Sequence, residues 1–284
     1  MTSVKQELKR YNIFPRKRWG QNFLVNKSIL KQIVNVSDLE KEDIVIEIGA
    51  GWGGLSSAIA KKVKKVIAIE IDRGLFSVLT EKLAGFENIQ LVNEDALKFD
   101  YQKIARLYGK KIKIIANLPY SISTPIIFCL LDSRQYIESM VLMLQKEVAN
   151  RLTASPKTKT YGILAVLIQM YCDMSLEMIV PSAAFHPRPR VESAVVKFRI
   201  LDQPRISLKD ERYFKKVVKA AFAQKRKTLS NALKNAPFLQ ISPDGILSVC
   251  SSLDIDPQRR GETLTLEEFG KLSDGLLALG GQAQ

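Results

Sequence analysis

The stretch Ile44-Val45-Ile46-Glu47-Ile48-Gly49-Ala50-Gly51-Trp52-Gly53-Gly54 joins a run of β-branched residues to a glycine-rich turn. Its apolar first half predicts a buried strand over residues 44–48. The glycines allow the positive φ values of a sharp turn and let a ligand approach the backbone closely. The apolar segment 55–62 then predicts a helix. Strand, turn and helix in this order are typical of the first unit of an α/β domain.

Strands of the same kind continue along the chain, and a predicted helix over residues 26–38 precedes the first of them. Helical segments of ten or more residues separate most strands, which predicts a parallel sheet covered on both faces, with ligands at the carboxyl ends of its strands. The last run follows a proline-rich segment and predicts an antiparallel closing strand. The expected strands are residues 44–48, 66–70, 89–92, 113–116, 140–144, 178–180 and 191–200.

No strand is predicted beyond Pro204. Short helices are expected over residues 207–235, 243–252 and 264–278, with prolines near their boundaries. We therefore expect two domains: residues 1–204 as an α/β domain with a basic N-terminal arm, and residues 205–284 as a small helical domain.

The positive charge of the chain is concentrated in two segments. The 284 residues include 43 Lys or Arg and 29 Asp or Glu, for a formal net charge of +14. Residues 1–31 hold eight basic and one acidic side chain, and residues 209–234 hold nine and two. This pattern indicates a polyanionic partner, either a nucleic acid or a membrane surface. No apolar run approaches the roughly 20 residues of a membrane span, and no apolar signal segment opens the chain, so we expect a cytoplasmic protein.

Cysteine and histidine are too few and too scattered for several kinds of chemistry. Cys129, Cys172 and Cys250 lie more than 40 residues apart, which supports neither a zinc site nor a disulfide framework. His186 is the only histidine, and the chain has no G-x-S-x-G motif to accompany it. We therefore expect no metal and no histidine-dependent hydrolysis.

Acidic residues at the ends of the next two strands suit a nucleoside cofactor. Glu70 lies 21 residues beyond Gly49, where a carboxylate can accept both ribose hydroxyl hydrogens of NAD or of S-adenosylmethionine. Gly49, Gly51 and Gly54 also fit the dinucleotide pattern G-x-G-x-x-G, so the turn leaves both cofactors open. Asp95 follows the third strand and can accept from an adenine amine, which shifts the balance modestly toward S-adenosylmethionine.

The segment Asn117-Leu118-Pro119-Tyr120 ends the fourth strand and suits methyl transfer to an aromatic amine. Such an amine is a poor nucleophile because its lone pair is delocalised into the ring. The Asn117 side-chain oxygen and a backbone carbonyl of Leu118 or Pro119 could accept its two hydrogens and favour a pyramidal nitrogen, while Tyr120 stacks on the base. Positioning and electrostatics then supply most of the barrier reduction, and no strong general base is required.

A second aromatic candidate is Phe185, which opens the proline-stiffened segment Phe185-His186-Pro187-Arg188-Pro189-Arg190. A base flipped out of its stack could lie between Phe185 and Tyr120. Arg188 and Arg190 are expected to meet phosphates. The alternative is a Phe that packs beneath a connecting segment.

These blocks, in this order, resemble the small-subunit rRNA adenine N6,N6-dimethyltransferase family, the KsgA/RsmA enzymes, over nearly the whole chain. Trp19 stands where the family usually has Phe, and Trp52 where it often has Leu, so we expect altered packing near the cofactor rather than lost activity. The other matching blocks are residues 17–24 (KRWGQNFL), 68–72 (AIEID), 94–97 (EDAL), 145–152 (QKEVANRL), 193–196 (SAVV) and 226–231 (RKTLSN).

The resemblance implies a Rossmann-like methyltransferase fold, a mostly parallel seven-stranded sheet with an antiparallel closing strand, followed by a small helical domain. It implies S-adenosylmethionine-dependent dimethylation of two adjacent adenosines in the 3′-terminal hairpin loop of 16S rRNA, by a monomer acting on the immature small ribosomal subunit. The target adenine would contact Asn117, Leu118, Pro119, Tyr120 and Phe185. The cofactor would contact Asn22, Leu24, Gly49, Gly51, Glu70, Asp95, Ala96 and Asn117.

The two basic segments are interpreted as separate RNA contacts on either side of the adenine pocket. The first is expected to line the RNA entrance, and the second to hold an adjacent rRNA helix by its phosphates. The expected RNA-binding residues, including those of the proline-rich segment, are Arg16, Lys17, Arg18, Arg188, Arg190, Lys225, Arg226 and Lys227.

Three other functions are compatible with parts of the sequence. The large-subunit (23S) rRNA adenine methyltransferases of the macrolide-resistance type share the fold and an N-[IL]-P-[YF] motif, although the blocks at 193–196 and 226–231 favour the small-subunit enzymes. A non-catalytic rRNA-binding assembly factor would need only the basic surface, and the intact Asn-Leu-Pro-Tyr segment argues against it. An NAD-dependent oxidoreductase is a distant third.

Overall fold

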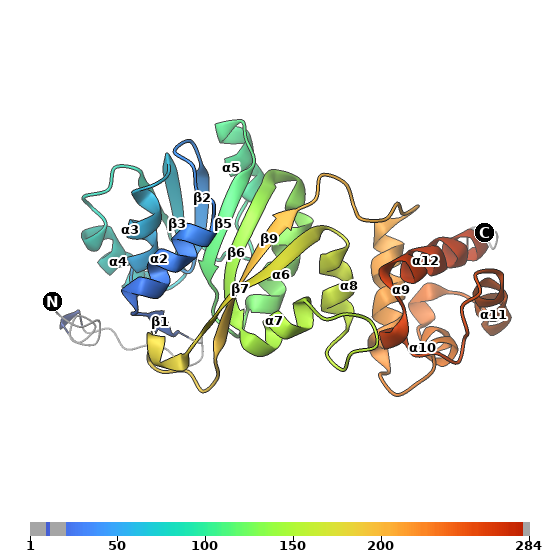
Figure 1. Ribbon diagram of the computed structural model, residues 1–284. Coiled ribbons are helices and arrows are strands. Elements are labelled where there is room, and N and C mark those ends of the chain that lie inside the picture. Colours follow the sequence, from blue (N-terminus) through green and yellow to red (C-terminus); the bar gives the residue numbers. More distant parts are fainter. Residues whose placement is uncertain (1–9, 12–20, 281–284) are drawn as a thin grey trace. The chain divides into compact units, whose positions relative to one another are not determined.

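The computed structural model describes residues 10, 11 and 21–280 (Figure 1). Seven strands form one sheet in the order β4-β3-β2-β5-β6-β9-β7. The five strands from β4 to β6 pair in parallel, and β9 pairs antiparallel to β6. The strands are β2 (Ile44–Ile48), β3 (Lys65–Ile69), β4 (Ile89–Val92), β5 (Ile112–Asn117), β6 (Ile137–Gln145), β7 (Cys172–Val180) and β9 (Ser193–Ile200).

This sheet confirms the expected Rossmann-like α/β class. The predicted antiparallel closing strand is β9, and it lies inside the sheet, between β6 and β7. The strand predicted at residues 178–180 is only the end of β7, which begins at Cys172. The sequence signal was weak there because β7 mixes polar and apolar residues, most of them exposed or half-buried, and so forms no apolar run.

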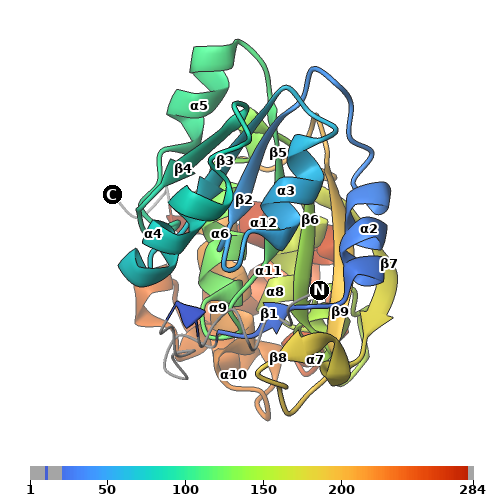
Figure 2. The same cartoon turned by 90° about the vertical axis from the view of Figure 1, so that its left-hand side faces the viewer.

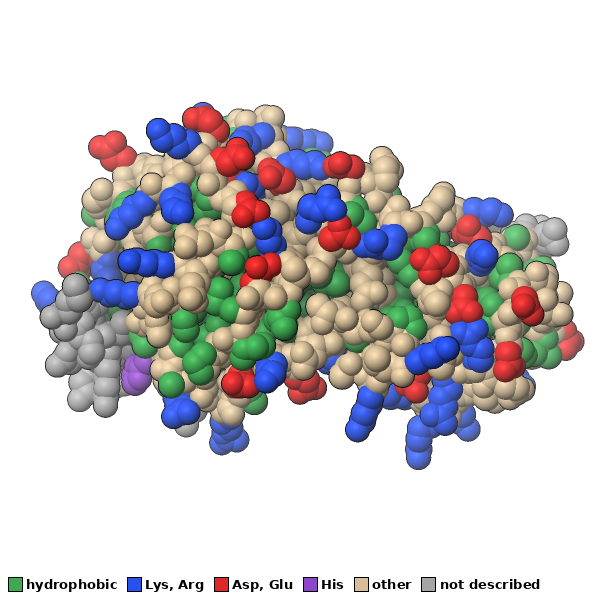
Figure 3. Space-filling view, in the orientation of Figure 1, with side chains coloured by type: hydrophobic (Ala, Val, Ile, Leu, Met, Phe, Trp, Pro, Cys, Tyr) green, Lys and Arg blue, Asp and Glu red, His purple; other side chains and the backbone are tan. Residues whose placement is uncertain are grey.

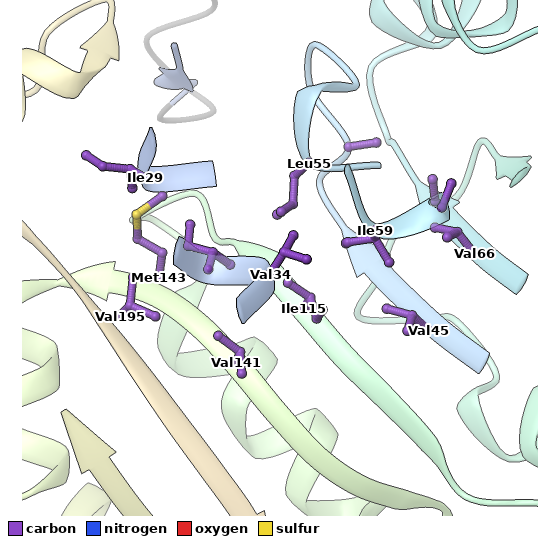
Figure 4. Close-up of a cluster of buried hydrophobic side chains, with 14 of the residues drawn as sticks. Ile29, Val34, Val45, Leu55, Ile59, Val66, Ile115, Val141, Met143 and Val195 are labelled. Carbon is purple, nitrogen blue, oxygen red and sulfur yellow. The ribbon is translucent and has the colours of Figure 1, made fainter. Parts of the chain in front are cut away.

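Helices pack against the sheet through apolar faces. In α2, the Asn26 side chain caps the first turn by accepting hydrogen bonds from the backbone N–H groups of Ser28 and Ile29. Figure 4 shows side chains of α2 and α3 meeting Val45, Ile115 and Val141 of the strands in one buried cluster. The helices of this part are α2 (Lys27–Val36), α3 (Gly54–Ala60), α4 (Arg73–Lys82), α5 (Tyr101–Tyr108), α6 (Ser123–Asp132) and α7 (Lys146–Leu152).

A separate two-stranded sheet joins segments that are far apart in the sequence. Strand β1 (Phe23–Leu24) pairs antiparallel with β8 (Phe185–His186), and Figure 2 shows the two strands side by side. Val25 N also donates to Ala184 O at 2.9 Å. These bonds link the Gln-Asn-Phe-Leu segment to the start of the proline-rich segment.

The chain divides into two compact units. The first comprises residues 1–149 and 173–200, and the second comprises residues 150–172 and 201–284. Residues 150–172, which the sequence-based division assigns to the first domain, therefore group with the helices. Their backbone explains this, since Leu201 N donates to Tyr171 O at 2.9 Å and Arg205 Nε to Gln169 O at 2.9 Å.

The second unit is built from helices around its own apolar core. Phe222 of α9 and Phe269 of α12 lie with ring centroids 5.7 Å apart. A Cβ at Gly261 would lie 2.6 Å from Ala221 O, so only glycine allows this close backbone approach. Among the described helices, none is both long and apolar enough to cross a membrane. The helices of this unit are α8 (Ile163–Gln169), α9 (Glu211–Ala223), α10 (Leu229–Lys234), α11 (Pro243–Ser252) and α12 (Leu266–Gly280).

Candidate active site

The glycine-rich turn connects β2 to α3 through three positive φ values. Gly49, Gly51 and Gly53 have φ of +75°, +56° and +76°. The turn is held against the end of β3, because Gly49 N and Ala50 N both donate to Ile69 O, at 2.9 and 3.1 Å. A Cβ at Gly51 would lie 3.2 Å from Phe23 Cδ1, so this position combines conformational strain with crowding for any other residue.

Glu70 lies directly beyond β3 and is bound by the same turn. Its Oε2 accepts from Gly51 N and its Oε1 from Asp72 N, each at 2.9 Å. The carboxyl is only 5% exposed, and burial raises its pKa despite these two bonds. A carboxylate oxygen has two acceptor sites, so each oxygen retains capacity for one more donor. Glu70 is therefore able to accept from two ribose hydroxyls while staying fixed to the turn.

The next acidic residue, Asp95, begins a short turn beyond β4. Its Oδ1 accepts from Leu97 N at 3.0 Å, which orients the carboxylate, and the neighbouring Ala96 is buried. Both residues line the same pocket as Glu70. So does Ile71, whose side chain is 52% exposed. An exposed apolar side chain that lines the pocket together with Glu70 and Asp95 suits a flat aromatic base, and its exposure is not visible in the sequence.

Asn117 ends β5 and is oriented by the Gln-Asn-Phe-Leu segment. Its Nδ2 donates a hydrogen bond to Asn22 O at 3.1 Å, and this bond fixes the orientation of the side-chain amide. Within the described part of the chain, Asn117 Oδ1 accepts no hydrogen bond. Pro119 O accepts from Ile122 N at 3.1 Å, whereas no described residue donates a backbone N–H to Leu118 O. Asn117 Oδ1 and Leu118 O are therefore the acceptors available for an amine.

Tyr120 is the last residue of this segment, and both its backbone carbonyl and its side-chain hydroxyl make hydrogen bonds. Its carbonyl accepts from Ser123 Oγ at 3.1 Å, and its hydroxyl lies 2.7 Å from Ser193 Oγ. Partial burial raises the pKa of the Tyr120 hydroxyl, and the bond to Ser193 lowers it by less. The phenol therefore stays neutral at physiological pH, which keeps the ring suitable for stacking on a base.

One pocket collects the predicted cofactor and catalytic residues at the carboxyl ends of the strands. Its lining contains every predicted cofactor residue and all of Asn117 to Tyr120. The glycine-rich turn, Glu70 and Asp95 lie between residues 49 and 95, whereas the hydrogen-bond acceptors lie in residues 117–120. The sheet brings these two parts of the sequence together at one pocket. The predicted residues in the lining are Asn22, Leu24, Gly49, Gly51, Glu70, Asp95, Ala96, Asn117, Leu118, Pro119 and Tyr120.

Phe185 lies elsewhere. Its side chain is 4% exposed, belongs to the buried cluster with α2 and α3, and does not line the pocket. Its backbone pairs with Leu24 through the β1–β8 sheet. The structure thus gives Phe185 a packing position next to the site, and the sandwich with Tyr120 stays a prediction.

Glu47 is a second residue of the pocket lining that was not predicted from the sequence. It lines the pocket, yet it is 1% exposed, and its Oε2 has no hydrogen-bond partner among the described residues. Its pKa is raised to about 8, chiefly by burial and to a smaller degree by the nearby Glu70 carboxylate. Ser56 lies close enough to lower this pKa, but its hydroxyl is also without a partner of good geometry. An acid within an apolar strand was the available sequence signal.

Comparison with known proteins is consistent with this site. The family model described as ribosomal RNA adenine dimethylase matches residues 14–269. The chain belongs to this family. The adenine dimethylase assignment confirms the expected enzyme class, an S-adenosylmethionine-dependent rRNA adenine dimethyltransferase.

Relatives of this adenine dimethylase cover nearly its whole length. The protein named ribosomal RNA small subunit methyltransferase A from Geobacter metallireducens is 44% identical over 268 residues, 94% of this chain and 97% of the relative. The protein of the same name from Clostridium acetobutylicum is 42% identical over 272 residues, 96% and 97% of the two chains.

Solved structures agree with the fold. A dimethyladenosine transferase from Plasmodium falciparum has a TM-score of 0.73 at 26% identity, covering 90% of this chain and 97% of the other. The 23S rRNA methyltransferase ErmE has a TM-score of 0.68 at 22% identity, covering 90% and 99%. The second likeness shows the shared fold only.

The departure at Trp52 places an indole in the lining of the pocket of this adenine dimethylase. The indole is 8% exposed and lies 6.3 Å from the Phe23 ring, centroid to centroid. Lys82 Nζ lies 4.0 Å from the centroid of the same ring, within the range of a cation–π contact. Trp52 therefore joins α4 to the segment that contributes Asn22 and Leu24.

The predicted RNA contacts of the adenine dimethylase are exposed where the structure describes them. Arg188 and Arg190 are exposed, and Arg188 Nε donates to Ser182 Oγ at 2.9 Å. Lys225, Arg226 and Lys227 are exposed beyond the end of α9, and Figure 3 shows Lys and Arg side chains gathered along the lower edge of the helical unit. The other predicted contacts, Arg16, Lys17 and Arg18, lie outside the described residues.

Proposed function

We propose that this enzyme transfers four methyl groups from S-adenosylmethionine to the N6 atoms of two adjacent adenosines in the 3′-terminal hairpin loop of 16S rRNA. The substrate is the immature small ribosomal subunit, and the enzyme acts on it in the cytoplasm as a monomer. One observation carries the proposal: Asn117 Oδ1 and Leu118 O, two acceptors without a described partner, belong to the same pocket as Glu70 and the glycine-rich turn.

The residues of the pocket fit S-adenosylmethionine. Glu70 would accept from the ribose hydroxyls, Asp95 from the adenine amine, and Ile71 would contact the face of the adenine ring. Gly51 lines the same pocket, and its backbone N–H holds the Glu70 carboxylate in place. When bound, the cofactor supplies a methyl group on a positively charged sulfur.

Amine positioning is the main chemical task of this chain. Asn117 and Leu118 would accept the two N6 hydrogens and so favour the pyramidal nitrogen that attacks the methyl group. After the first transfer one N–H remains for one of these acceptors, and after the second none remains. This loss of donors explains why the reaction would stop at the dimethylated base.

Phosphate contacts would supply most of the affinity for the subunit. Arg188 and Arg190 follow β8 and would meet the backbone next to the target, with Phe185 as a second stacking candidate. Lys225, Arg226 and Lys227 would hold an adjacent rRNA helix, and Arg16, Lys17 and Arg18 would line the entrance.

Two competing functions make different predictions. A 23S rRNA methyltransferase would modify the large subunit, and the names of the relatives at 42–44% identity argue for the small subunit instead. A non-catalytic assembly factor would bind rRNA without needing the acceptors of the Asn117 to Tyr120 segment. We therefore favour the dimethyltransferase of the small subunit.

The test is to incubate the purified protein with S-adenosylmethionine and with undermethylated small or large subunits in separate reactions. We expect N6,N6-dimethyladenosine at two adjacent positions in the 3′-terminal hairpin of 16S rRNA. Methylation confined to 23S rRNA would overturn the choice of substrate. Tight binding of small subunits without any methyl transfer would instead support the assembly factor.

A further inference from the structure

The backbone on either side of the Tyr120 side chain is fixed by hydrogen bonds. Leu118 N donates to Met143 O at 3.2 Å, and Ser123 Oγ donates to Tyr120 O at 3.1 Å. These bonds fix the path of the backbone but do not restrict the side-chain torsions that orient the Tyr120 ring. A hydrogen bond at the far end of the side chain restricts the plane of the ring.

That contact is made by a residue outside the catalytic segment. Ser193 Oγ lies 2.7 Å from the Tyr120 hydroxyl, and Ser193 is 0% exposed. Ser193 does not line the pocket, so it is not placed to touch the cofactor or the base there.

Ser193 is itself held firmly. It is the first residue of β9 and pairs with Gln145 of β6. The preceding residue, Glu192, is bound twice by Lys146: Lys146 N donates to Glu192 O at 3.0 Å, and Lys146 Nζ lies 2.9 Å from Glu192 Oε2. A side chain on such a backbone makes a rigid anchor for its partner.

We propose that Ser193 is a positioning residue for the reaction, which sets the orientation of the Tyr120 ring through their shared hydrogen bond. This inference rests on the proposed role of Tyr120 in stacking on the target adenine. Ser193 follows Arg190 by three residues, so the segment that would meet the RNA backbone leads directly into the residue that orients the ring.

The expected consequence concerns the rate rather than the binding of the subunit. Phosphate contacts dominate affinity for RNA, so losing the Ser193 bond leaves KM for the subunit within about twofold. A ring that is free to turn holds the base in the reactive geometry for a smaller fraction of the time. A misplacement of about 1 Å can cost a hundredfold, and for a partly retained stack we expect a loss of about tenfold in kcat.

The experiment compares Ser193→Ala, Tyr120→Phe and the double variant in single-turnover methylation of undermethylated small subunits. Tyr120→Phe keeps the ring and removes the same bond from the other side. We expect each single variant and the double variant to lose about the same factor in rate, because all three lack one shared interaction. Losses that multiply in the double variant would mean independent, merely structural roles and would overturn the proposal.

Two further variants separate the possible failures. Ser37→Ala removes another buried serine hydroxyl, which donates to Ile33 O at 2.7 Å within α2, and we expect the wild-type rate for it. Tyr120→Ala tests the stacking role itself, and a wild-type rate there would overturn that part of the proposed function. A slow Tyr120→Ala combined with Ser193→Ala and Tyr120→Phe at the wild-type rate would overturn only the positioning role. If Ser193→Ala does not fold, Tyr120→Phe alone still decides, since it breaks the same bond.

Discussion

Glu47 carries a carboxyl group that folding makes harder to ionise. Its pKa is raised to about 8, chiefly by burial, so the folded state binds a proton that the unfolded state releases near the ordinary value of 4.5. The stability that this proton contributes is complete below about pH 4.5 and is lost as pH rises toward 8. We therefore expect Glu47→Gln to gain stability over the wild type as pH rises, measured as the difference in Tm between pH 5 and pH 8.5.

The matched control for this prediction is Glu42→Gln. Glu42 is exposed and pairs with Lys64 at 2.9 Å, which lowers its pKa, so its ionisation is complete across the same pH range. The Tm difference between Glu42→Gln and the wild type should not change from pH 5 to pH 8.5. A Glu47→Gln variant that behaves in the same way would contradict the raised pKa.

Gly51 offers a second prediction for a single residue. Alanine there would have φ of +56° and a Cβ 3.2 Å from the Phe23 ring. The left-handed conformation alone costs about 1–2 kcal/mol, and the added methyl group would crowd the Phe23 ring, which also lines the pocket. We expect Gly51→Ala to lower Tm and to weaken S-adenosylmethionine binding about tenfold or more, measured by calorimetric titration.

Gly85→Ala is the control for that measurement. A Cβ at Gly85 meets nothing within 4 Å, so the substitution adds a side chain without a clash. We expect an unchanged affinity for the cofactor. Equal affinities of the two alanine variants would show that the turn does not approach the ligand.

Among the elements, α2 was predictable from a single capping residue together with the helical spacing of its apolar side chains. Asn26 accepts from Ser28 N at 2.9 Å and from Ile29 N at 3.2 Å. Asn26→Ala leaves both donors without this partner, and we expect a loss of about 1 kcal/mol in the free energy of unfolding by urea. Asn26→Gly should cost only a few tenths of a kcal/mol, because glycine is also tolerated at this position. Equal losses would argue against a capping role.

Apolar runs made most of the sheet predictable, whereas short pairings were not. Residues 44–48 and 89–92 were predicted as strands and form β2 and β4 with the same bounds. Strands β1 and β8 contain two residues each and lie far apart in the sequence. No periodicity exists in two residues, so this pairing depends on tertiary contacts alone.

The residues of the candidate active site show the same contrast between patterns visible along the sequence and contacts formed only on folding. That Glu70, Asp95 and Asn117 would line one pocket was predictable, because the carboxyl ends of parallel strands meet at one edge of a sheet. Glu47 was missed because it sits inside an apolar run, and its burial is visible only in the folded chain. Ser193 was part of a recognised block, but its partner Tyr120 lies 73 residues earlier, and sequence spacing does not indicate such a contact.

For the whole molecule, the division into units was only partly visible in the sequence. The described residues beyond 204, which end at 280, contain no strand, and this change in pattern marked the start of the helical region. Residues 150–172 group with that region through contacts such as Leu201 N to Tyr171 O, at 2.9 Å. A segment between two strands of the sheet would be assigned to the sheet domain by any reading along the chain.

The net charge of +14 gives the last prediction, which concerns the molecule as a polycation. Each phosphate contact that a Lys or Arg makes releases counterions, so the affinity for RNA falls with salt by a slope of about 0.7–0.9 per contact. Replacing Lys225, Arg226 and Lys227 together by Gln should therefore reduce this slope by about 2–3, if all three meet phosphates.

Lys61, Lys62 and Lys64 are also exposed, and their replacement by Gln removes the same charge from another surface. We expect that control to change the slope much less when the binding of small subunits is measured between 50 and 200 mM salt, conditions over which multi-contact complexes lose affinity by orders of magnitude. Equal slopes for both triple variants would mean that the helical unit contributes only general charge, and not a defined contact with rRNA.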